Sequence, residues 1–371
     1  MASTGTSISV YADRIKRAQA EMAAQGIDFL LVGASSDLFY LLGFNAHLSE
    51  RLNLLIIPRE GRPSYVVPVL ESPLVRDKKE ISDLAIWTET ESPSELVAKI
   101  IGNASGKKLA VADQLWSVFL IRMQTAVPGA SWTSANDVLR ALRMQKDDYE
   151  IDRLTEVSRL TDEAWHEFIE GGPISGLTET ETMERLQSFM AKRGLRGGFG
   201  ICASGPNSAS PHHHTGDRVL QHGDAVIFDW GATLDGYHSD ITRTVHIGEP
   251  GEEYRKVYDI VMQANQATLD AVTPGVPCED LDKVARKVIT DAGYGPQFLH
   301  RVGHGLGLDV HEEPYLVGGN TMPLAEGMVF SDEPGIYIEG KFGVRIEDAV
   351  VCTATGGIRI NHATRAITIM D

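Results

Sequence analysis

Two segments in the second half of the chain constrain the fold most strongly, because each has the pattern of a β-hairpin whose apolar strands contain acidic residues. In 225–247, apolar runs flank a central turn that contains Asp235. A two-residue turn centred on Leu234 and Asp235 sets Asp229 opposite Asp240. Like charges this close are tolerated when they are protonated, solvated or bridged by a cation. The pattern predicts a shared acidic face; two unrelated surface aspartates in another register are the alternative.

The second hairpin pattern, 327–352, repeats this arrangement. With its turn at Gly340, Glu333 and Glu347 are each seven residues from the centre and therefore lie opposite each other. Glu347 falls within a strand that should be largely buried, where an unpaired carboxylate costs several kcal/mol. A bound metal would remove that cost, and a buried salt bridge with Arg345 explains the pattern equally well.

A histidine-rich segment follows in the same half of the chain. His300, His304 and His311 fall within twelve residues, and glycines on both sides of His304 place it on a loop or strand rather than on a helix. A phosphate-binding loop is disfavoured, because no Lys-Ser/Thr pair follows and no dinucleotide fingerprint is present. A lone histidine is more often structural, but three beside two acidic hairpins indicate a site.

The four carboxylates and the imidazole of His304 form an oxygen-rich donor set, unlike the Cys/His set of structural zinc. This set favours Mn²⁺ or Co²⁺, with Zn²⁺ also possible. Five protein ligands exceed what one ion needs if water is also to bind, whereas two ions roughly 3.5 to 4 Å apart that share bridging carboxylates use them all. Such a site activates water, and hydrolysis of an amide is a natural reaction.

The first 145 residues have the pattern of a small α/β domain. Short apolar runs predict strands, which turns and helical patterns separate. The first helix, over 10–25, has Ile15, Ala18 and Met22 on one face. The predicted strands are 29–32, 54–57, 65–69 and 109–112, and the further helices are 94–102 and 135–144.

The pattern changes after residue 145, where a long polar helix over 146–169 leads into the two hairpins. Local strand pairs with segregated helices indicate an α+β domain rather than a doubly wound sheet. With 371 residues and 43% hydrophobic content, the chain can bury a core in each of two domains, 1–145 and 146–371. The later helices are predicted over 178–193, 252–272 and 278–291.

Composition excludes several functional classes. A net charge of -17, of which residues after 150 carry -15, argues against a nucleic-acid partner. That acidity indicates a solvated surface or, in part, carboxylates gathered around cations. No apolar run approaches the length of a membrane span, so neither export nor membrane insertion is expected. Three widely spaced cysteines are too few for a disulfide framework and fit the reducing cytoplasm.

The order and spacing of these motifs closely resemble the proline-specific metallopeptidases of the pita-bread fold, which are Xaa-Pro aminopeptidases and Xaa-Pro dipeptidases (prolidases) of peptidase family M24. The resemblance is strong over 205–352 and extends more loosely to the whole chain, with a creatinase/prolidase-like N-terminal domain. The motifs that carry it are Asp229-Trp-Gly-Ala, Ser-Asp240-Ile-Thr-Arg-Thr, Gly-His304-Gly-Leu-Gly-Leu, His311-Glu, Glu333-Pro-Gly and Arg345-Ile-Glu347.

This resemblance implies an α+β chain with a pita-bread catalytic domain and a dinuclear site. In it, Asp229 binds one ion, His304 and Glu333 bind the other, and Asp240 and Glu347 bridge both.

Further site residues follow only from the resemblance. His212 matches a histidine near the scissile bond, His311 one that contacts the substrate carbonyl, and Glu333 the carboxylate that moves the proton. His300 matches a residue that lines the proline pocket, and Tyr337 coincides with a position near the site. Arg345 either orients the ligands or forms a purely structural ion pair.

Dipeptidases and aminopeptidases of this family are harder to separate. Many prolidases have an arginine directly after the His-Glu-Xaa-Pro segment, where this chain has Tyr315. Arg51 of a homodimer partner could supply the cation for a substrate carboxylate, and Asp37 could hold a substrate ammonium; an ordinary surface ion pair is the alternative for each. The short N-terminal domain favours a dipeptidase that acts on small proline-containing peptides.

Three other classes share this fold. A metal-free creatinase-like hydrolase lacks the ligand set, and a methionine aminopeptidase lacks a preceding domain of this size. A noncatalytic binding protein is expected to have lost at least one ligand. All five ligand positions are retained here.

Overall fold

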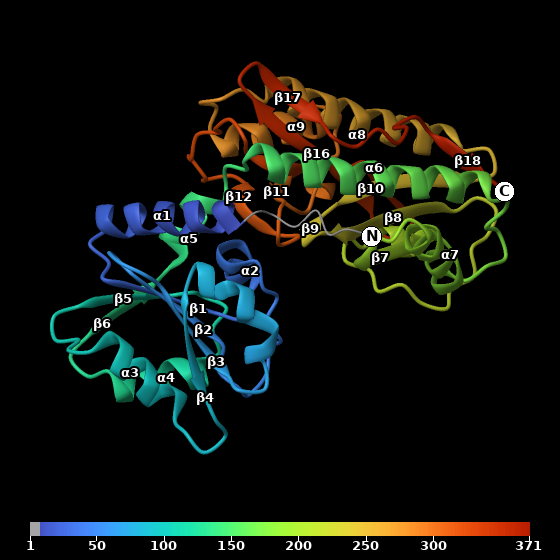
Figure 1. Ribbon diagram of the computed structural model, residues 1–371. Coiled ribbons are helices and arrows are strands. Elements are labelled where there is room, and N and C mark those ends of the chain that lie inside the picture. Colours follow the sequence, from blue (N-terminus) through green and yellow to red (C-terminus); the bar gives the residue numbers. More distant parts are fainter. Residues whose placement is uncertain (1–7) are drawn as a thin grey trace. The chain divides into compact units, whose positions relative to one another are not determined.

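The computed structural model describes residues 8–371, which form two compact units. The first unit ends at Arg143, and the second begins at Met144 and extends to Asp371 (Figure 1). Each unit has its own buried apolar clusters. Within residues 8–371, no helix combines the length and apolar character that crossing a membrane requires.

The first unit is built around one six-stranded mixed sheet with the order β4-β3-β2-β1-β5-β6 (Figure 1). Its strands are β1 (Phe29–Gly33), β2 (Leu54–Pro58), β3 (Ser64–Pro68), β4 (Asp83–Trp87), β5 (Lys108–Val111) and β6 (Ser131–Ser134). Its helices are α1 (Ile8–Ala24), α2 (Ser36–Leu42), η1 (Ser72–Glu80), α3 (Pro93–Ile101), α4 (Ser117–Ala126) and α5 (Asn136–Arg143).

All four strands and three helices predicted in this unit are confirmed. Ile15, Ala18 and Met22 of α1 are buried, as its periodicity indicated. The strands β4 and β6 were not predicted, because both are edge strands with exposed positions and so have no continuous apolar run. The short helix α2 was also missed; it begins where the Ser35 hydroxyl accepts a hydrogen bond from Leu38 N–H.

The second unit contains two five-stranded sheets and a two-stranded hairpin. One sheet has the order β18-β10-β8-β7, with β9 paired to β8, and the other has the order β12-β11-β13-β16-β17. The strands of the first are β7 (Arg196–Ser204), β8 (Ala225–Leu234), β9 (Tyr237–His238), β10 (Ile241–Ile247) and β18 (Thr368–Met370). Those of the second are β11 (Gly303–Gly305), β12 (Glu312–Leu316), β13 (Val329–Asp332), β16 (Asp348–Thr353) and β17 (Gly356–Arg359). The hairpin is β14 (Gly335–Ile338) with β15 (Phe342–Arg345).

Four long helices cover these sheets. They are α6 (Asp148–Glu170), α7 (Glu179–Lys192), α8 (Glu252–Ala271) and α9 (Cys278–Asp291), and two short turns, η2 (Gly205–Ala209) and η3 (Gly295–Gln297), connect to strands. α6 and α7 pack on β8 and β7, whereas α8 and α9 pack on the strands of the second sheet (Figure 1). All four were predicted. Capping boxes at Asp147 and Thr178 explain why α6 and α7 begin where they do.

The predicted hairpin over 225–247 exists, but its predicted register was wrong. Asp235 and Gly236 both have positive φ, 52° and 89°, and form the two-residue turn, with Leu234 opposite Tyr237. The turn therefore lies one residue later than predicted, since both of its residues must adopt left-handed backbone angles. Asp229 is consequently opposite Thr242 rather than Asp240.

The predicted register of the second hairpin is confirmed. The pairs Gly335–Arg345 in β14–β15 and Asp332–Asp348 in β13–β16 have the same register, centred on Gly340. Glu333 lies between β13 and β14, and Glu347 lies between β15 and β16. The two glutamates therefore face each other where the hairpin passes from one sheet to the next.

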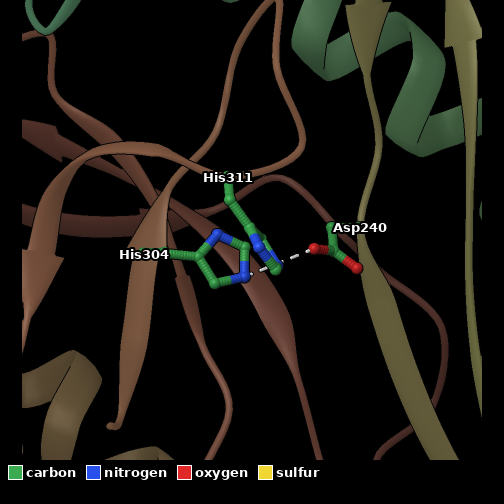
Figure 2. Close-up of side chains that lie close together, drawn as sticks. All are labelled: Asp240, His304 and His311. Atoms are coloured by element: carbon green, nitrogen blue, oxygen red, sulfur yellow. Dashed lines mark ion pairs between the residues drawn. The ribbon is translucent and has the colours of Figure 1, made fainter. Parts of the chain in front are cut away.

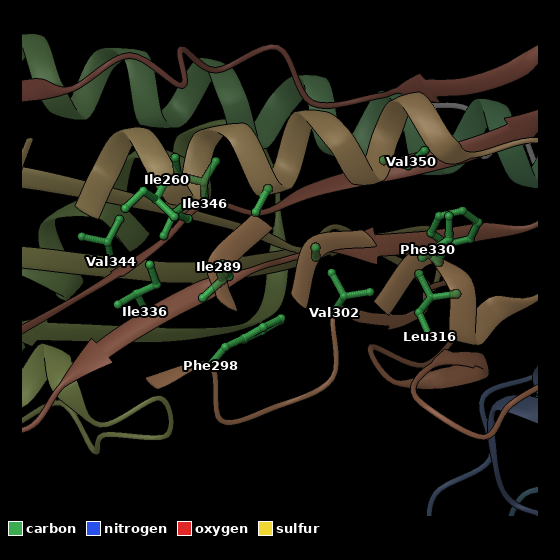
Figure 3. Close-up of a cluster of buried hydrophobic side chains, with 14 of the residues drawn as sticks. Ile260, Ile289, Phe298, Val302, Leu316, Phe330, Ile336, Val344, Ile346 and Val350 are labelled. Atoms are coloured by element: carbon green, nitrogen blue, oxygen red, sulfur yellow. The ribbon is translucent and has the colours of Figure 1, made fainter. Parts of the chain in front are cut away.

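A large apolar cluster supports this hairpin from α8 and α9 (Figure 3). Phe330 of β13 is fully buried in it, three residues before Glu333. Packing on this scale holds a strand in one place, because interiors have few voids into which a side chain can move.

Phe330→Ala should lower the free energy of unfolding by about 3–5 kcal/mol, because it deletes a buried ring and leaves a cavity. Calorimetric melting of the purified protein measures the change. The matched control is Val317→Ala, at a position 38% exposed, which should change stability by no more than about 0.5 kcal/mol. Equal effects of the two substitutions would contradict the packing argument.

Candidate metal centre and active site

Two of the predicted ligands come from the β8–β10 hairpin. Asp229 lies on β8, and Asp240 lies just before β10 and is 3% exposed. In the observed register, the two aspartates are diagonal neighbours on one face. The predicted acidic face is therefore present, although the predicted register was wrong. One oxygen of Asp229 accepts a hydrogen bond from Arg345 at 2.7 Å, and the other is buried without a partner among the described residues.

His304 reaches the same place from β11. Its backbone N–H donates to the Ser331 hydroxyl at 3.0 Å. The neighbouring glycines are needed for close packing of strands, because a Cβ at Gly303 would lie 1.9 Å from the Ser331 carbonyl oxygen and one at Gly305 would lie 2.3 Å from that of Glu313. Glycines therefore surround His304 in order to bring it to its neighbours, not to bind phosphate.

Glu333 and Glu347 complete the set. Glu333 Oε1 lies 3.2 Å from His304 Nε2 and accepts a hydrogen bond from the Ser331 hydroxyl at 3.2 Å. Glu347 Oε2 accepts a hydrogen bond from the Thr242 hydroxyl at 2.6 Å, and the backbone N–H of Glu347 donates to the Thr242 carbonyl at 3.1 Å. These contacts join the two sheets at Thr242.

The five side chains converge in overlapping groups of possible ligands. In each group the ligand atoms lie within 4.8 Å of one another. Figure 2 shows the side chains of His304, His311 and Asp240 close together, with His304 Nε2 3.6 Å from Asp240 Oδ2. The groups are Asp229, Asp240 and Glu347; His304, Glu333 and Glu347; and Asp240, His304 and His311.

The shifted pKa values of the clustered acids are those expected of a site that binds a cation. Burial, followed by the charge of Asp229, raises the pKa of Asp240 well above its ordinary range. Burial and the charges of the neighbouring acids also raise the pKa of Glu347 well above its ordinary range, and burial raises the pKa of Asp229. For Glu333, burial is outweighed by the hydrogen bond and charge of His304, which lower its pKa to about 2. Crowded carboxylates, one unpaired oxygen and an imidazole form a donor set suited to divalent ions.

A second chain of polar contacts runs beside the cluster. Arg345 is buried and donates to Asp229, Thr242 and Tyr337, the last at 3.0 Å. The Tyr337 hydroxyl in turn lies 2.8 Å from His300 Nε2. Because His300 Nδ1 lies 2.7 Å from the Arg301 carbonyl, Nδ1 carries the proton, and Nε2 accepts from Tyr337. The sequence-predicted His300, Tyr337 and Arg345 are thus linked to one another and to the cluster.

The two remaining predicted catalytic histidines lie in exposed positions. His311 is exposed as a residue, but its ring packs against that of His304 at a centroid distance of 4.0 Å. This partial burial of the ring, together with the charges of His304 and Arg301, lowers its pKa to about 4. His212 is exposed on the loop after η2, and its charge contributes to lowering the pKa of both His300 and His311.

Asp37 and Arg51 belong to the first unit and are both in ion pairs. Asp37 is buried on α2, and its carboxylate lies 2.6 Å from Arg143. Arg51 is paired with Glu50 at 2.6 Å and with Glu89 at 2.8 Å. These contacts correspond to the alternative interpretation, an ordinary ion pair; that of Asp37 is buried rather than on the surface.

Several supporting residues were missed. Thr242 and Ser331 each hold predicted ligands by hydrogen bonds, and the sequence indicated neither, because a lone hydroxyl in a strand carries no local signal. Glu179 looked like an ordinary acid at a helix start. It is fully buried instead.

Glu179 accepts hydrogen bonds from both sides of the loop after β7. The donors are Ser204 through its N–H (2.8 Å) and hydroxyl (2.7 Å), Asn207 (3.0 Å), His213 (2.8 Å) and Gly216 N–H (3.2 Å). Burial raises the pKa of Glu179, but these hydrogen bonds outweigh it and hold the pKa below its ordinary value. This carboxylate therefore fixes the loop that carries His212.

Comparisons with known proteins identify the family. The model of metallopeptidase family M24 matches residues 152–354, and that of the creatinase/prolidase N-terminal domain matches 14–145. The chain is 38% identical over 367 residues to a protein named probable dipeptidase PepE from Mycobacterium tuberculosis, with 97% of each covered.

Two solved structures are similar throughout. Dipeptidase PepE from Mycobacterium ulcerans has a TM-score of 0.92 at 38% identity, over 97% of this chain and 98% of that one. A recombinant prolidase from Thermococcus sibiricus also has a TM-score of 0.92 at 38% identity, over 97% and 99%. The chain therefore belongs to metallopeptidase family M24 and is a metal-dependent peptidase with a creatinase/prolidase N-terminal domain and a catalytic domain of the pita-bread fold.

Asp240→Asn should stabilise the metal-free protein and abolish metal binding. A carboxyl whose pKa is raised on folding destabilises the native state above its unfolded pKa, so replacing it by a neutral amide removes that penalty at pH 7. Melting in the presence of a chelator and elemental analysis measure the two effects. A lower melting temperature of the metal-free variant would contradict the repulsion argument.

Glu179→Gln should lower kcat/KM about 10- to 100-fold without loss of bound metal, because it loosens the loop that carries His212. Glu181→Gln, on the same helix but in an exposed capping box, is the matched control and should retain activity. Metal loss in the Glu179 variant would show that Glu179 acts on the metal site rather than on the loop.

Proposed function

We propose that this chain is an Xaa-Pro dipeptidase (prolidase), which hydrolyses the bond before proline in small peptides. The observation that carries this proposal is the convergence of Asp229, Asp240, His304, Glu333 and Glu347 beside the linked pair His300–Tyr337. The names of the similar proteins, dipeptidase PepE and prolidase, support it. An Xaa-Pro aminopeptidase that acts on longer peptides is the alternative.

The five converging residues would hold two divalent ions, for which we propose Mn²⁺. Asp229 would bind one ion, His304 and Glu333 the other, and Asp240 and Glu347 both. When bound, such ions polarise the scissile carbonyl and lower the pKa of water. Arg345 holds Asp229 at 2.7 Å, and Thr242 holds Glu347 at 2.6 Å, so both carboxylates are oriented before an ion binds.

His311, His212 and Glu333 would perform the proton and charge chemistry. His311, with its pKa near 4, is neutral at pH 7 and donates a ring N–H to the developing oxyanion, and His212 supports it. Glu333, with its pKa near 2, is a carboxylate at that pH. It accepts a proton from the water that attacks the scissile carbonyl and passes it to the proline nitrogen as the bond breaks.

An aromatic wall beside the cluster would receive the proline ring. The rings of Phe298 and His300 lie 5.3 Å apart, and those of His300 and Tyr337 lie 5.5 Å apart. Burial lowers the pKa of His300, so it presents a neutral ring. A neutral, rigid surface of this kind suits the apolar pyrrolidine ring.

Three further properties belong to the proposal. The domains are 1–145 and 146–371, the protein is cytoplasmic, and it forms a homodimer. The buried, unpaired cysteines are consistent with a reducing compartment. The first unit exposes large apolar side chains, including Leu70 and Leu74, which a second copy could cover. A substrate-binding role for Asp37 or Arg51 requires their ion pairs to open.

Steady-state rates with Ala-Pro and Ala-Pro-Ala test the dipeptidase assignment. We expect kcat/KM for the dipeptide to exceed that for the tripeptide by at least about 10-fold, because a site built for a terminal carboxylate rejects an internal amide. Preferential cleavage of the tripeptide would establish the aminopeptidase alternative.

Chelation tests the metal requirement. Dialysis against EDTA should abolish hydrolysis of Ala-Pro, and Mn²⁺ should restore it with about two ions per chain by elemental analysis, because five ligands exceed the need of one ion. Activity that persists in metal-free protein would exclude this mechanism.

A further inference from the structure

A dipeptidase has one recognition problem that the cluster does not solve. In Xaa-Pro the carboxylate belongs to the same residue whose nitrogen is cleaved, so it must lie close to the metal-binding side chains. Those side chains are mostly anionic and repel it. A cation near the cluster, without a carboxylate of its own, is therefore required; this inference rests on the proposed function.

Arg301 is such a cation. Its guanidinium carbon lies 4.3 Å from the ring centroid of Tyr315, which holds it by a cation–π contact. Tyr315 is the β12 partner of His304 in the β11–β12 ladder, so these two side chains share one face of the sheet. The Arg301 side chain is half-buried, and between residues 8 and 371 its guanidinium has neither a hydrogen-bond acceptor nor a carboxylate partner.

The other cations around the site are already engaged. Arg345 is paired with Asp229 at 2.7 Å, and Lys146 is paired with Glu312 at 2.7 Å. Arg286 is paired with Asp282 and also donates to backbone carbonyls. Each would have to give up a carboxylate in order to bind the substrate.

The position of Arg301 relative to the histidines also suits a cation that binds the substrate carboxylate. The guanidinium lies over the ring of Tyr315, and Tyr315 is paired with His304 across the β11–β12 ladder. His311 in turn packs against His304 at 4.0 Å. Arg301 thus lies on the His311 side of the cluster, adjacent in sequence to His300 of the aromatic wall.

We propose that Arg301 binds the C-terminal carboxylate of the Xaa-Pro substrate and that Tyr315 holds its guanidinium in place for this contact. A planar guanidinium matches a carboxylate with two parallel hydrogen bonds. A longer peptide presents a neutral amide at this position and leaves the cation without its partner. Arg301 therefore selects dipeptides over longer chains.

Arg301→Met tests the proposal with two substrates that differ only in charge. The KM for Ala-Pro should rise about 10- to 100-fold, as expected for loss of a charge-assisted pair. The KM for Ala-Pro amide should stay at the wild-type value. Arg301→Lys should recover part of the affinity for Ala-Pro, and Arg159→Met, at an exposed arginine of α6, should change neither KM. Equal changes for both substrates, or no change for either, would overturn the proposal.

Direct binding separates this proposal from the proposed function. Calorimetry on the Mn²⁺-loaded protein should detect L-proline binding that is at least about 10-fold tighter than binding of L-prolinamide, and Arg301→Met should abolish that difference. Tyr315→Leu should reduce the difference without abolishing it. If wild-type protein binds proline and prolinamide with equal affinity, Arg301 does not bind the carboxylate and the proposal is wrong. If it discriminates between them but does not hydrolyse Ala-Pro, the proposed function fails and the carboxylate site remains.

Discussion

Repulsion among buried carboxylates is the constraint on which the site depends. Asp229, Asp240 and Glu347 have raised pKa values because burial and mutual charge oppose ionisation. The pKa of the fourth acid, Glu333, is lowered instead, because the hydrogen bond and charge of His304 outweigh its burial. A group with a raised pKa destabilises the fold unless a cation balances it. Arg345 supplies one positive charge on the Asp229 side, and bound divalent ions would supply the rest.

Much of this arrangement could be predicted, because hairpins translate sequence spacing into spatial pairing. The register around Gly340 predicted that Glu333 and Glu347 meet, and the flanking pairs have that register. The register of the other hairpin was wrong, since the turn residues Asp235 and Gly236 both take positive φ. Its aspartates still meet, because diagonal neighbours on one face are also close.

The parts that sequence patterns did not reveal are those that arise from long-range packing. Thr242 joins Glu347 and Arg345 across two sheets, and Glu179 joins segments up to 37 residues apart. A threonine in a strand or a glutamate at a helix start has many ordinary explanations, so only the tertiary structure separates the functional case from the ordinary one. The same holds for edge strands such as β4, whose exposed positions give no apolar run.

The strand alternation around Glu333 and Glu347, the two glutamates proposed as metal ligands, explains why the register must be tightly specified. Asp332 and Asp348 directly neighbour Glu333 and Glu347, and they form a fully buried pair of their own. Asp348 is bound by Arg243 at 2.6 Å, and Arg243 also donates to the Glu347 carbonyl at 2.6 Å.

Successive side chains of a strand point to opposite faces, so a slip of one residue would exchange the aspartates for the glutamates. It would move Asp348 away from Arg243 and bury an unpaired arginine, which is strongly destabilising. The ion pair behind the hairpin therefore fixes which acids reach the candidate metal site, and the geometry of that site depends on a contact outside the five predicted ligand side chains.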